Sequence, residues 1–446
     1  MTGKGSKLPL VACAALIFAT LFCRDCLGVG VNKYLVLGLY IASFAFLKEG
    51  GIEVLLAFSM PFAYGLPFNY IALFAVLFIV FKRRALPDKV VLVLLLYLAF
   101  QEMAMTLWYS SVDMGSEAGY VSCLALLALL GFCDRGNSKR MLVAFVVGTA
   151  LAFLMVIQQT TANVPLESLL SGAARLGYAG AGAYGLDGSD ADTAGSMYVH
   201  FNPNEVGYYS LVSLACGLLL LVKSNASRAL ILACMAVSLL AGALSQSRTW
   251  TMMVAALVLV QVFLSVGRSG ERRRALATLA VVVTVVVVIV SQNPLLIDTI
   301  AQRFEGSDFA TANGRTELLE GYNDWFASQT WRVFFGTGVV GYKEVSGLWN
   351  SMHNGFQQLY VCLGVVGAAA FAGIIAYIAV RNVRHAEKLT PINFLPLIAA
   401  AAFVMSIQII NPWSLMLPFA LGFVALGVDG EPRRGLREII GAERHL

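Results

Sequence analysis

The chain has 446 residues, of which 59% are hydrophobic and only 13% are charged, and its mean hydropathy is +0.76. Soluble domains carry about 25% charged residues, so this composition excludes an ordinary soluble protein and indicates a polytopic membrane protein. No stretch poor in apolar residues is long enough to build a separate core, so we expect one transmembrane domain over residues 1–446. The net charge of +5 is explained by where the basic residues lie, and nucleic acid is not expected as a partner.

Apolar runs suited to membrane-spanning helices follow one another along most of the chain. A bilayer core about 30 Å thick needs about 20 apolar residues in a helix, and fewer inside a packed bundle. Pro61, Gly65 and Pro67 could either join two short spans or kink one, so we predict an all-α protein with 12–14 transmembrane helices. The fourteen candidate runs are 8–23, 31–47, 52–65, 67–81, 90–109, 119–133, 141–158, 205–222, 229–247, 250–266, 275–291, 354–380, 392–410 and 414–428.

Lysines and arginines between these runs fall on one side, which the positive-inside rule makes cytoplasmic. With fourteen spans both termini lie inside, and the two long polar loops, 159–204 and 292–353, lie outside the cytoplasm. ATP and nucleotide sugars are cytoplasmic, and the chain has no GxxxxGK[ST] motif, so chemistry on the outer face needs a substrate that is already activated and carried by the membrane. The basic groups lie within 4–7, 82–89, 135–140, 223–228, 268–274, 381–388 and 433–437.

The first outer loop, 159–204, is rich in glycine and alanine and then acidic, a composition that orders poorly by itself. It ends in Asn202-Pro203-Asn204, which predicts a turn into a helix with Asn204 as the N-cap.

Arg248 lies in an outer turn between two spans. An arginine held this close to hydrocarbon is expensive unless it is paired, which makes it a functional candidate. The alternative is an arginine that only snorkels to lipid headgroups.

The second outer loop, 292–353, is predicted to contain a short amphipathic helix over 315–326, with Leu318 and Tyr322 on its apolar face. Arg315 would lie in the first turn, where free backbone N–H groups and the helix dipole favour an anion and the guanidinium adds a geometry suited to phosphate. The alternative is a structural salt bridge from Arg315 to Glu317 or Glu320.

His353 and Asn354 open the span 354–380 from the outer side. His353 could act as a general base or hydrogen-bond donor, or it could simply pack at the membrane interface. No metal is expected, because His200 is the only other imidazole on this face and the Cys23/Cys26 pair has no further ligands nearby.

Glu102 is an acidic residue inside a predicted span, in the sequence Gln101-Glu102. Such an acid suggests a proton or substrate path, but it could equally be buried and protonated, or paired with Arg248.

Taken together, these motifs resemble the O-antigen ligase and polymerase superfamily of bacterial envelope enzymes. The features that carry the resemblance are Ser247-Arg248, a large outer loop with Arg315 and Trp325, the turn Phe335-Gly336-Thr337-Gly338, His353-Asn354-Gly355-Phe356 leading into Leu363-Gly364-Val365-Val366-Gly367, and upstream Asn202-Pro203-Asn204. The resemblance is best over about 198–380. Arg175 is matched to a further arginine of the family, although its separation from Asn202 is unusually long.

The resemblance implies a metal-independent glycosyltransferase of the bacterial cytoplasmic (inner) membrane that needs no cofactor. Its partners would be an undecaprenyl-diphosphate-linked glycan, an acceptor glycan or glycolipid, and the membrane lipids, with the active site on the extracytoplasmic face. Arg248 and Arg315 would bind the diphosphate and His353 would assist the acceptor hydroxyl, with Asn354, Arg175 and Asn204 in the substrate site. The glycine-rich turn could let a sugar chain approach the backbone.

The sequence does not separate a ligase from a polymerase. A lipid-linked glycan flippase or polysaccharide transporter is the main alternative, and it would line its helices with charge along a path. A purely structural or sensory protein would leave the outer loop with its arginines and histidine unexplained.

Overall fold

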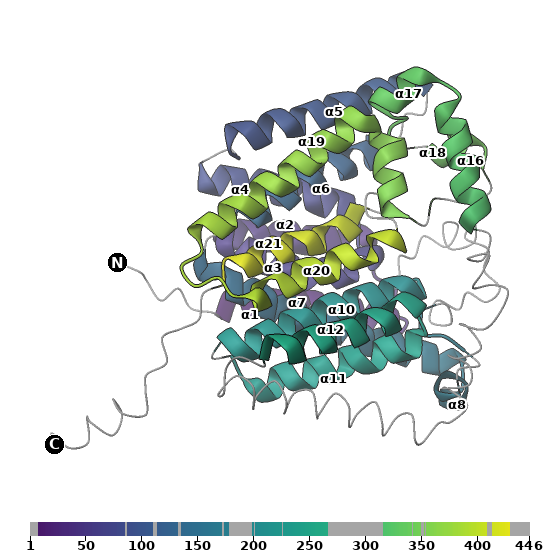
Figure 1. Cartoon of the computed structure of the whole chain (residues 1–446). Helices are drawn as coiled ribbons and strands as arrows, with labels where there is room; N and C mark the ends of the chain where they lie inside the picture. The colour runs from purple at the N-terminus through teal and green to yellow at the C-terminus, as the bar shows by residue number, and fades with distance from the viewer. Residues whose placement is uncertain are drawn as a thin grey trace, which may run out of the picture.

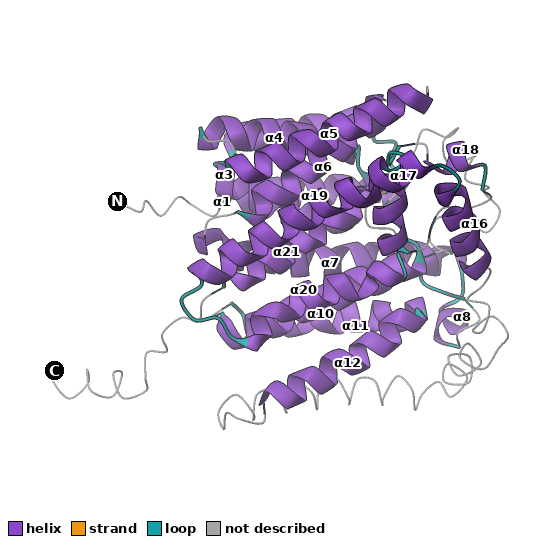
Figure 2. Cartoon of the chain, turned by 45° about the horizontal axis from the view of Figure 1, so that its top comes forward, coloured by secondary structure: helices purple, strands orange, loops and turns teal. Residues whose placement is uncertain are grey.

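The structure, a computed structural model, shows a bundle of long helices, and every regular element in its described part is helical (Figures 1 and 2). It describes residues 8–84, 87–109, 114–132, 135–171, 174–177, 199, 201–224, 226–265, 315–340, 342–348, 352, 354–407 and 413–428.

The N-terminal half of the bundle forms the predicted early spans as separate helices. Pro61 lies in a single 3-10 segment after α3 and Pro67 is the N-cap of α4, so the prolines join two helices and do not kink one. The elements are α1 (Leu8–Cys26), α2 (Lys33–Phe46), α3 (Glu49–Ser59), η1 (Met60–Gly65), α4 (Phe68–Arg83), α5 (Lys89–Tyr109), α6 (Met114–Gly131), α7 (Arg135–Asn163) and the short α8 (Leu166–Leu170).

The C-terminal half differs from the predicted runs in two places. The span expected at 354–380 is longer and bends at Gly364, and the run 392–410 is broken into three short pieces. The predicted run 275–291 lies outside the described residues. The elements are α10 (Pro203–Lys223), α11 (Arg228–Ser245), α12 (Arg248–Ser265), α16 (Arg315–Ala327), α17 (Thr330–Phe335), α18 (Tyr342–Ser346), α19 (Gly355–His385), η4 (Pro391–Phe394), α20 (Leu395–Ala402), η5 (Phe403–Met405), η6 (Trp413–Met416) and α21 (Leu417–Leu426).

Six of the described helices are long and apolar enough to cross a bilayer: α1, α5, α7, α10, α11 and α19. Shorter apolar helices pack among them, including α2, α6 and α21. The protein is therefore an all-α polytopic membrane protein, as its composition predicts.

Helix α10 lies at the centre of the bundle and is the most buried of the six long helices. Its glycines let neighbours approach closely, since an added Cβ at Gly207 would lie 3.0 Å from Cβ of Trp250 on α12, and one at Gly217 would lie 2.6 Å from Met235 on α11. Small residues at helix contacts are how membrane helices gain packing area. The bundle therefore holds the start of α12, and with it Arg248, against the start of α10.

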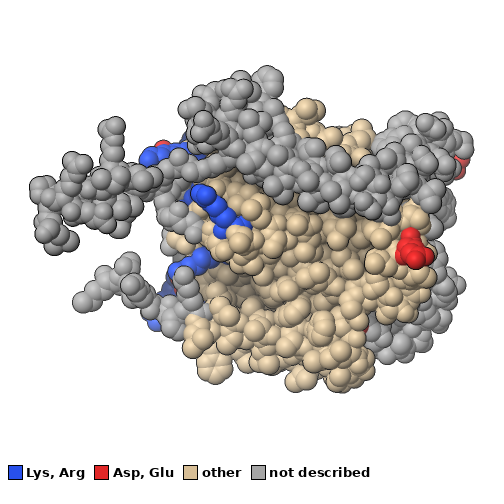
Figure 3. Space-filling view, turned by 90° about the horizontal axis from the view of Figure 1, so that it is seen from below, with Lys and Arg blue, Asp and Glu red and all other residues tan. Residues whose placement is uncertain are grey.

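One end of the bundle, here called the basic end, carries most of the described lysines and arginines, several of which are visible on one face (Figure 3). Arg83 at the end of α4 is paired with the buried Glu53 of α3, which also accepts a hydrogen bond from Asn137 of α7 (3.3 Å). Lys223 at the end of α10 donates to the carbonyl of Lys388 (2.7 Å) and to Asn393 (2.6 Å). Broad uncharged surface separates this end from the acidic side chains at the other (Figure 3).

The opposite end, here called the loop end, carries the short helices α8, α16, α17 and α18 (Figure 1). The turns that connect the long helices at this end contain most of the candidate site residues.

Candidate active site

Arg248 is the first residue of α12, directly after a tight turn. Helix α11 ends at Ser245, and Gln246 then adopts a left-handed conformation with φ 49°, stabilised by a hydrogen bond from its N–H to the carbonyl of Ala243 (3.0 Å). Such a turn reverses the chain within two residues, so Arg248 lies at the mouth of the bundle, half-buried, as the sequence predicts.

Arg175 lies against this same turn. Its Nε donates to the carbonyl of Ser245 (3.0 Å) and one Nη donates to the carbonyl of Gln246 (3.5 Å). The backbone reinforces the contact, because the N–H of Leu176 donates to Leu244 (2.9 Å) and the side chain of Gln246 donates to the carbonyl of Ala174 (2.9 Å). The structure thus brings Arg175 and the Arg248 turn together across about 70 residues of sequence.

The long sequence separation between Arg175 and Asn202 does not separate them in space. Gly177, at φ 117°, packs so closely that an added Cβ would lie 2.7 Å from the carbonyl oxygen of Phe201 and 3.0 Å from the nitrogen of Pro203. The chain on either side of residues 178–198 therefore meets at the start of α10, and Arg175 is adjacent to the Asn-Pro-Asn turn in spite of the spacing.

The predicted N-cap at Asn204 is wrong by two residues. Asn202 caps α10, because its side chain accepts from the N–H of Asn204 (3.0 Å) and Glu205 returns a bond to the N–H of Asn202 (2.8 Å), which completes a capping box with Pro203 at the first helical position. This arrangement leaves the side chain of Asn204 to accept a hydrogen bond from Ser247 Oγ (3.1 Å). Asn204 thus lies beside the residue that precedes Arg248.

A buried ion pair that the sequence did not single out holds the segment leading into this turn. Arg24 and Asp25 at the end of α1 are paired; Arg24 donates to the carbonyl of Gly65 (2.8 Å), and Asp25 accepts from the N–H of Val199 (3.0 Å). Tyr64, next to Gly65, donates to Glu205 (2.7 Å). Two adjacent charges at the end of an apolar run were the only sequence signal for this role.

The predicted amphipathic helix is confirmed as α16. Leu318, Tyr322 and Phe326 are buried on one face, and Arg315 is the first residue of the helix. The Arg315 side chain lies outside the described residues, so neither anion binding nor the alternative salt bridge to Glu317 or Glu320 is tested.

Helix α16 packs on the first turns of α19. Gln357 donates to the carbonyl of Leu319 (2.8 Å) and to Asn323 (3.2 Å), and the rings of Phe326 and Tyr360 lie 4.6 Å apart. Residue numbers rise together along this contact, so the two helices run the same way. The start of α16, with Arg315, and the start of α19 therefore lie on the same side of the contact.

Asn354 is the N-cap of α19, and its side chain accepts from the N–H groups of Phe356 (3.0 Å) and Gln357 (3.2 Å). A structural role thus accounts for Asn354, and its predicted part in substrate binding stays a prediction. His353 and His200 lie outside the described residues. His353 directly precedes this cap in the sequence.

The glycine-rich turn serves a purpose different from the predicted one. Gly364 bends α19 with φ 63°, and the carbonyls on the first side of the bend accept from the turn: Val361 from the N–H of Thr337 (3.1 Å) and Cys362 from the N–H of Gly338 (3.0 Å). A Cβ at Gly336 would overlap the carbonyl of Cys362. These glycines let two backbones cross at the bend, so the expectation that the turn admits a sugar chain loses its basis.

Glu102 accepts hydrogen bonds from this turn and does not pair with Arg248. Its carboxylate, 1% exposed, receives the N–H of Val339 (2.7 and 2.9 Å to the two oxygens) and of Val340 (2.7 Å). The preceding residue, Gln101, donates to the carbonyl of Leu363 (2.7 Å) on the other side of the crossing and to that of Phe335. These bonds give Glu102 a partner within the bundle in place of the predicted proton or substrate path.

The bend redirects the start of α19. The first turns of α19 stand beside α18 and α16, turned away from the rest of the helix, and the starts of α16 and α19 lie toward the ends of α10, α11 and α12 (Figures 1 and 2). Arg175 and Asn204 lie at that end and form hydrogen bonds with the turn that directly precedes Arg248. Arg315 and Asn354 start the two helices that approach it.

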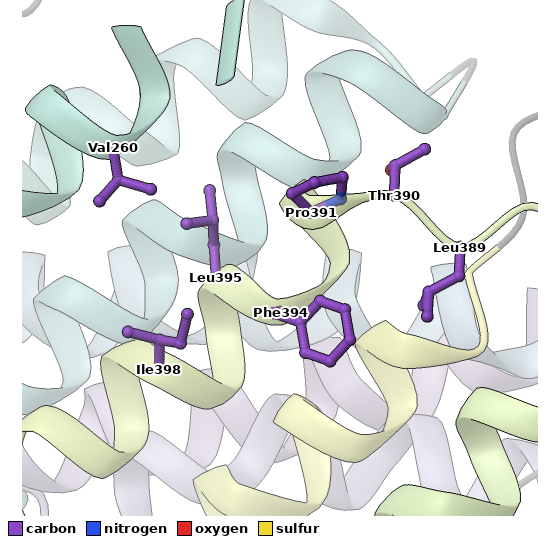
Figure 4. A pocket seen from close by; sticks show the side chains of 7 residues that line it. All are labelled: Val260, Leu389, Thr390, Pro391, Phe394, Leu395 and Ile398. Atoms are coloured by element: carbon purple, nitrogen blue, oxygen red, sulfur yellow. The ribbon is translucent and has the colours of Figure 1, made fainter. Parts of the chain in front are cut away.

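Other features of the described residues offer less chemistry. No group of three His, Cys, Asp or Glu side chains within them is placed to hold a metal ion. An apolar groove of about 420 Å³ lies between α12 and the η4–α20 segment, and none of the candidate site residues lines it (Figure 4). Its lining residues are Val260, Leu389, Thr390, Pro391, Phe394, Leu395 and Ile398.

One known protein family matches the part of the chain that contains most of these candidate residues. Residues 213–372, from within α10 to within α19, match the family model described as O-antigen ligase. This central part of the chain is therefore similar to the O-antigen ligase family. The matched range contains Arg248, Arg315 and His353, while Arg175 and Asn204 lie before it. Among curated proteins, none matches the chain significantly.

The match to the O-antigen ligase family supports a glycosyl-transferring enzyme of polysaccharide biosynthesis, of the ligase or polymerase type. Its helices make it a multi-pass membrane protein.

Proposed function

We propose that this protein transfers a glycan from undecaprenyl diphosphate to an acceptor sugar at the loop end of the bundle, on the outer face of the cytoplasmic membrane, without a metal or other cofactor. The observation that carries the proposal is the group formed by Arg175, Asn204 and the Ser247-Arg248 turn at the mouth of the bundle. Segments far apart in the sequence meet there around two arginines, beside the starts of two helices.

Cleavage of a sugar–phosphate bond leaves a diphosphate, and cations fixed in advance stabilise the charge that develops on it. Arg248 and Arg315 would supply that stabilisation, since guanidinium groups bind phosphate oxygens through two N–H groups at once and each of these arginines begins a helix, where free N–H groups also favour an anion. Arg175 and Asn204 would orient the Arg248 turn through the bonds described above.

His353 would act on the acceptor hydroxyl. It precedes the N-cap of α19, whose start approaches the Arg248 group, and an imidazole can take a proton near neutral pH. The basic-end residues do not compete for this role, because their charges lie at the opposite end of the helices.

The decisive experiment gives the purified full chain, in lipid nanodiscs, a defined glycan on undecaprenyl diphosphate and a candidate acceptor, with and without a chelator. We expect a covalent glycan product and free undecaprenyl diphosphate in both conditions. A product on a lipid A core acceptor indicates a ligase, and a doubled lipid-linked repeat indicates a polymerase. Translocation of the intact donor without a covalent product would favour the flippase alternative, and loss of product with the chelator would contradict metal independence.

Topology provides a separate test. Gln329, in the exposed turn between α16 and α17, and Glu387, in the exposed turn after α19, lie at opposite ends of the bundle. In a background without native cysteines, Gln329→Cys should react with an impermeant maleimide in cells whose outer barrier is opened, whereas Glu387→Cys should react only after the inner membrane is broken. The reverse pattern would place the site in the cytoplasm and contradict the proposal.

A further inference from the structure

The turn Gly336–Val340 and the bend of α19 form a backbone crossing, and within the turn the side chain of Thr337 bonds across it, from Oγ1 to the carbonyl of Val361 (3.2 Å). Three carbonyls just before the bend accept hydrogen bonds at the crossing: Val361 from the N–H of Thr337 (3.1 Å), Cys362 from the N–H of Gly338 (3.0 Å) and Leu363 from the side chain of Gln101 (2.7 Å). Backbone groups in a bilayer must be satisfied within the protein. The crossing is therefore stable only while the N–H groups of the turn lie opposite the carbonyls of the bend, an alignment called here the register.

The Glu102 carboxylate fixes that register from α5. It accepts from the N–H groups of Val339 and Val340 at 2.7 to 2.9 Å, at the point where the turn leaves the crossing toward α18. Gln101 binds the carbonyls on both sides of the crossing, Phe335 and Leu363, from the preceding position on the same helix. Gln101 and Glu102, which are adjacent on α5, thus bind both backbone segments that cross here, the glycine-rich turn and the bend of α19.

The titratable groups that face this carboxylate come from two other helices, α6 and α19. Glu117 of α6, which accepts from Thr106, and Tyr120 of α6 face it, as does the Cys362 thiol of α19. Burial of a carboxylate here costs solvation that a simple helix contact would not require. The three hydrogen bonds from its two N–H partners, Val339 and Val340, offset this cost.

We propose that Glu102 is a positioning residue for glycan transfer. By fixing the turn across the bend, its carboxylate holds the first turns of α19 at the angle that places the start of this helix, with its N-cap Asn354, toward the Arg248 turn. His353 directly precedes Asn354 in the sequence. Glu102 acts through this crossing and does not touch substrate. The catalytic consequence rests on the proposed function. The contact of the Glu102 carboxylate with the N–H groups of Val339 and Val340, here called the clamp, can be tested without it.

The test compares Glu102→Gln with Glu53→Gln. Both residues are buried carboxylates of membrane helices that accept several hydrogen bonds, but Glu53 lies at the basic end and binds Arg83 and Asn137. Hydrogen–deuterium exchange of the full chain in nanodiscs would follow peptides spanning 335–348, and steady-state kinetics would give kcat and the KM for the undecaprenyl-diphosphate-linked donor.

In Glu102→Gln we expect faster exchange at Val339 and Val340 and a fall in kcat of about 100-fold, the size that a misplacement of about 1 Å can produce, with the donor KM nearly unchanged. Glu102→Asp should recover part of kcat, and adding Glu102→Gln to His353→Ala should cause little further loss. Glu53→Gln should lower the melting temperature and change neither the exchange of this turn nor kcat per folded molecule. If Glu102→Gln does not yield folded protein, Gly338→Ala disturbs the same turn from within, because its φ is 82° and its Cβ would lie 2.9 Å from Met105.

Unchanged exchange at Val339 and Val340 in Glu102→Gln would overturn the clamp whatever the activity. Faster exchange with a normal kcat would leave Glu102 a purely structural residue and overturn the positioning role. If the wild-type chain transfers no glycan, the proposed function fails and the positioning role fails with it, while the exchange data still decide whether the clamp exists.

Discussion

The two ends of the bundle differ in what most of their buried polar side chains bind. At the basic end several of them join one helix end to another, as when Asn382 of α19 donates to the carbonyls of Gly131 on α6 (2.9 Å) and Phe423 on α21 (3.1 Å), and Lys223 also binds the turn carbonyl of Lys388 (2.7 Å). At the loop end they hold backbone that is not helical: Arg175 binds the turn after α11, and Glu102 binds the glycine-rich turn.

This difference indicates where the protein concentrates its chemistry. Irregular backbone at membrane depth is tolerated only where protein satisfies its polar groups, so each turn at the loop end needs a dedicated partner from a neighbouring helix. Binding and catalytic residues are commonly found on such segments when a rigid scaffold positions them. This pattern supports the proposal that the loop end holds the active site.

The largest effect should come from His353→Ala. If His353 takes the acceptor proton, its loss should lower the rate of transfer by about 10²–10⁴-fold while leaving binding of the undecaprenyl-diphosphate donor nearly intact. Arg315→Ala, by contrast, should weaken donor binding itself. Equal losses of donor affinity in the two variants, measured by direct binding, would assign His353 to the diphosphate site.

The next largest effect should come from arginine substitutions, which should lower the rate of transfer at the loop end and leave it unchanged at the basic end. Arg248→Lys and Arg315→Lys keep the charge but lose the planar fork, and each should lower kcat by about 10²–10³-fold, the loss seen when one fixed donor to a developing charge is removed. Arg381→Lys at the basic end, where the guanidinium lies 4.5 Å from the Phe132 ring, should leave transfer unchanged. Wild-type product from both lysine variants at the loop end would rule out bidentate recognition of diphosphate.

A pair of glycines tests the backbone crossing through stability. Gly336 and Gly347 both have positive φ (74° and 67°), but a Cβ at Gly336 would overlap the Cys362 carbonyl and one at Gly347 would meet nothing within 4 Å. Gly347→Ala should therefore cost only the strain of the left-handed conformation, about 1–2 kcal/mol, and Gly336→Ala clearly more. Thermal unfolding in detergent would measure both, and equal shifts would contradict a close crossing.

The smallest contrast concerns two serines at helix starts. Ser227 caps α11 at the basic end, accepting from Leu230 N–H (3.4 Å), and Ser247 accepts from Trp250 N–H (3.5 Å) just before α12. Either change to alanine should cost about 1 kcal/mol of stability. Only Ser247→Ala also loses the bond to Asn204, so it alone should raise the donor KM, by up to about tenfold. A matching rise in Ser227→Ala would mean that the effect is one of stability.

Much of the fold follows from the sequence because local patterns dictate it. Runs of apolar residues in a bilayer leave the helix as the main solution for the backbone, so the positions of α1, α2, α4, α5, α10, α11 and α12 were predictable to within a few residues, as was the amphipathic α16. Asn204 shows the limit of such reasoning. Asn202 and Asn204 could both serve as the N-cap by sequence, but Pro203 suits the first helical position, and this makes Asn202 the cap.

The sequence by itself determined the polytopic all-α class and the placement of Arg248, Arg315 and Asn354 at helix starts, since each depends on residues close together in the chain. Only the tertiary structure decided that Arg175 joins the Arg248 turn, that Glu102 binds Val339 and Val340, and that Gly364 turns the start of α19. Those contacts join residues up to 238 positions apart, as in the bond between Glu102 and Val340. Which distant backbone group satisfies a buried polar side chain depends on how the helices pack, and no local pattern encodes it.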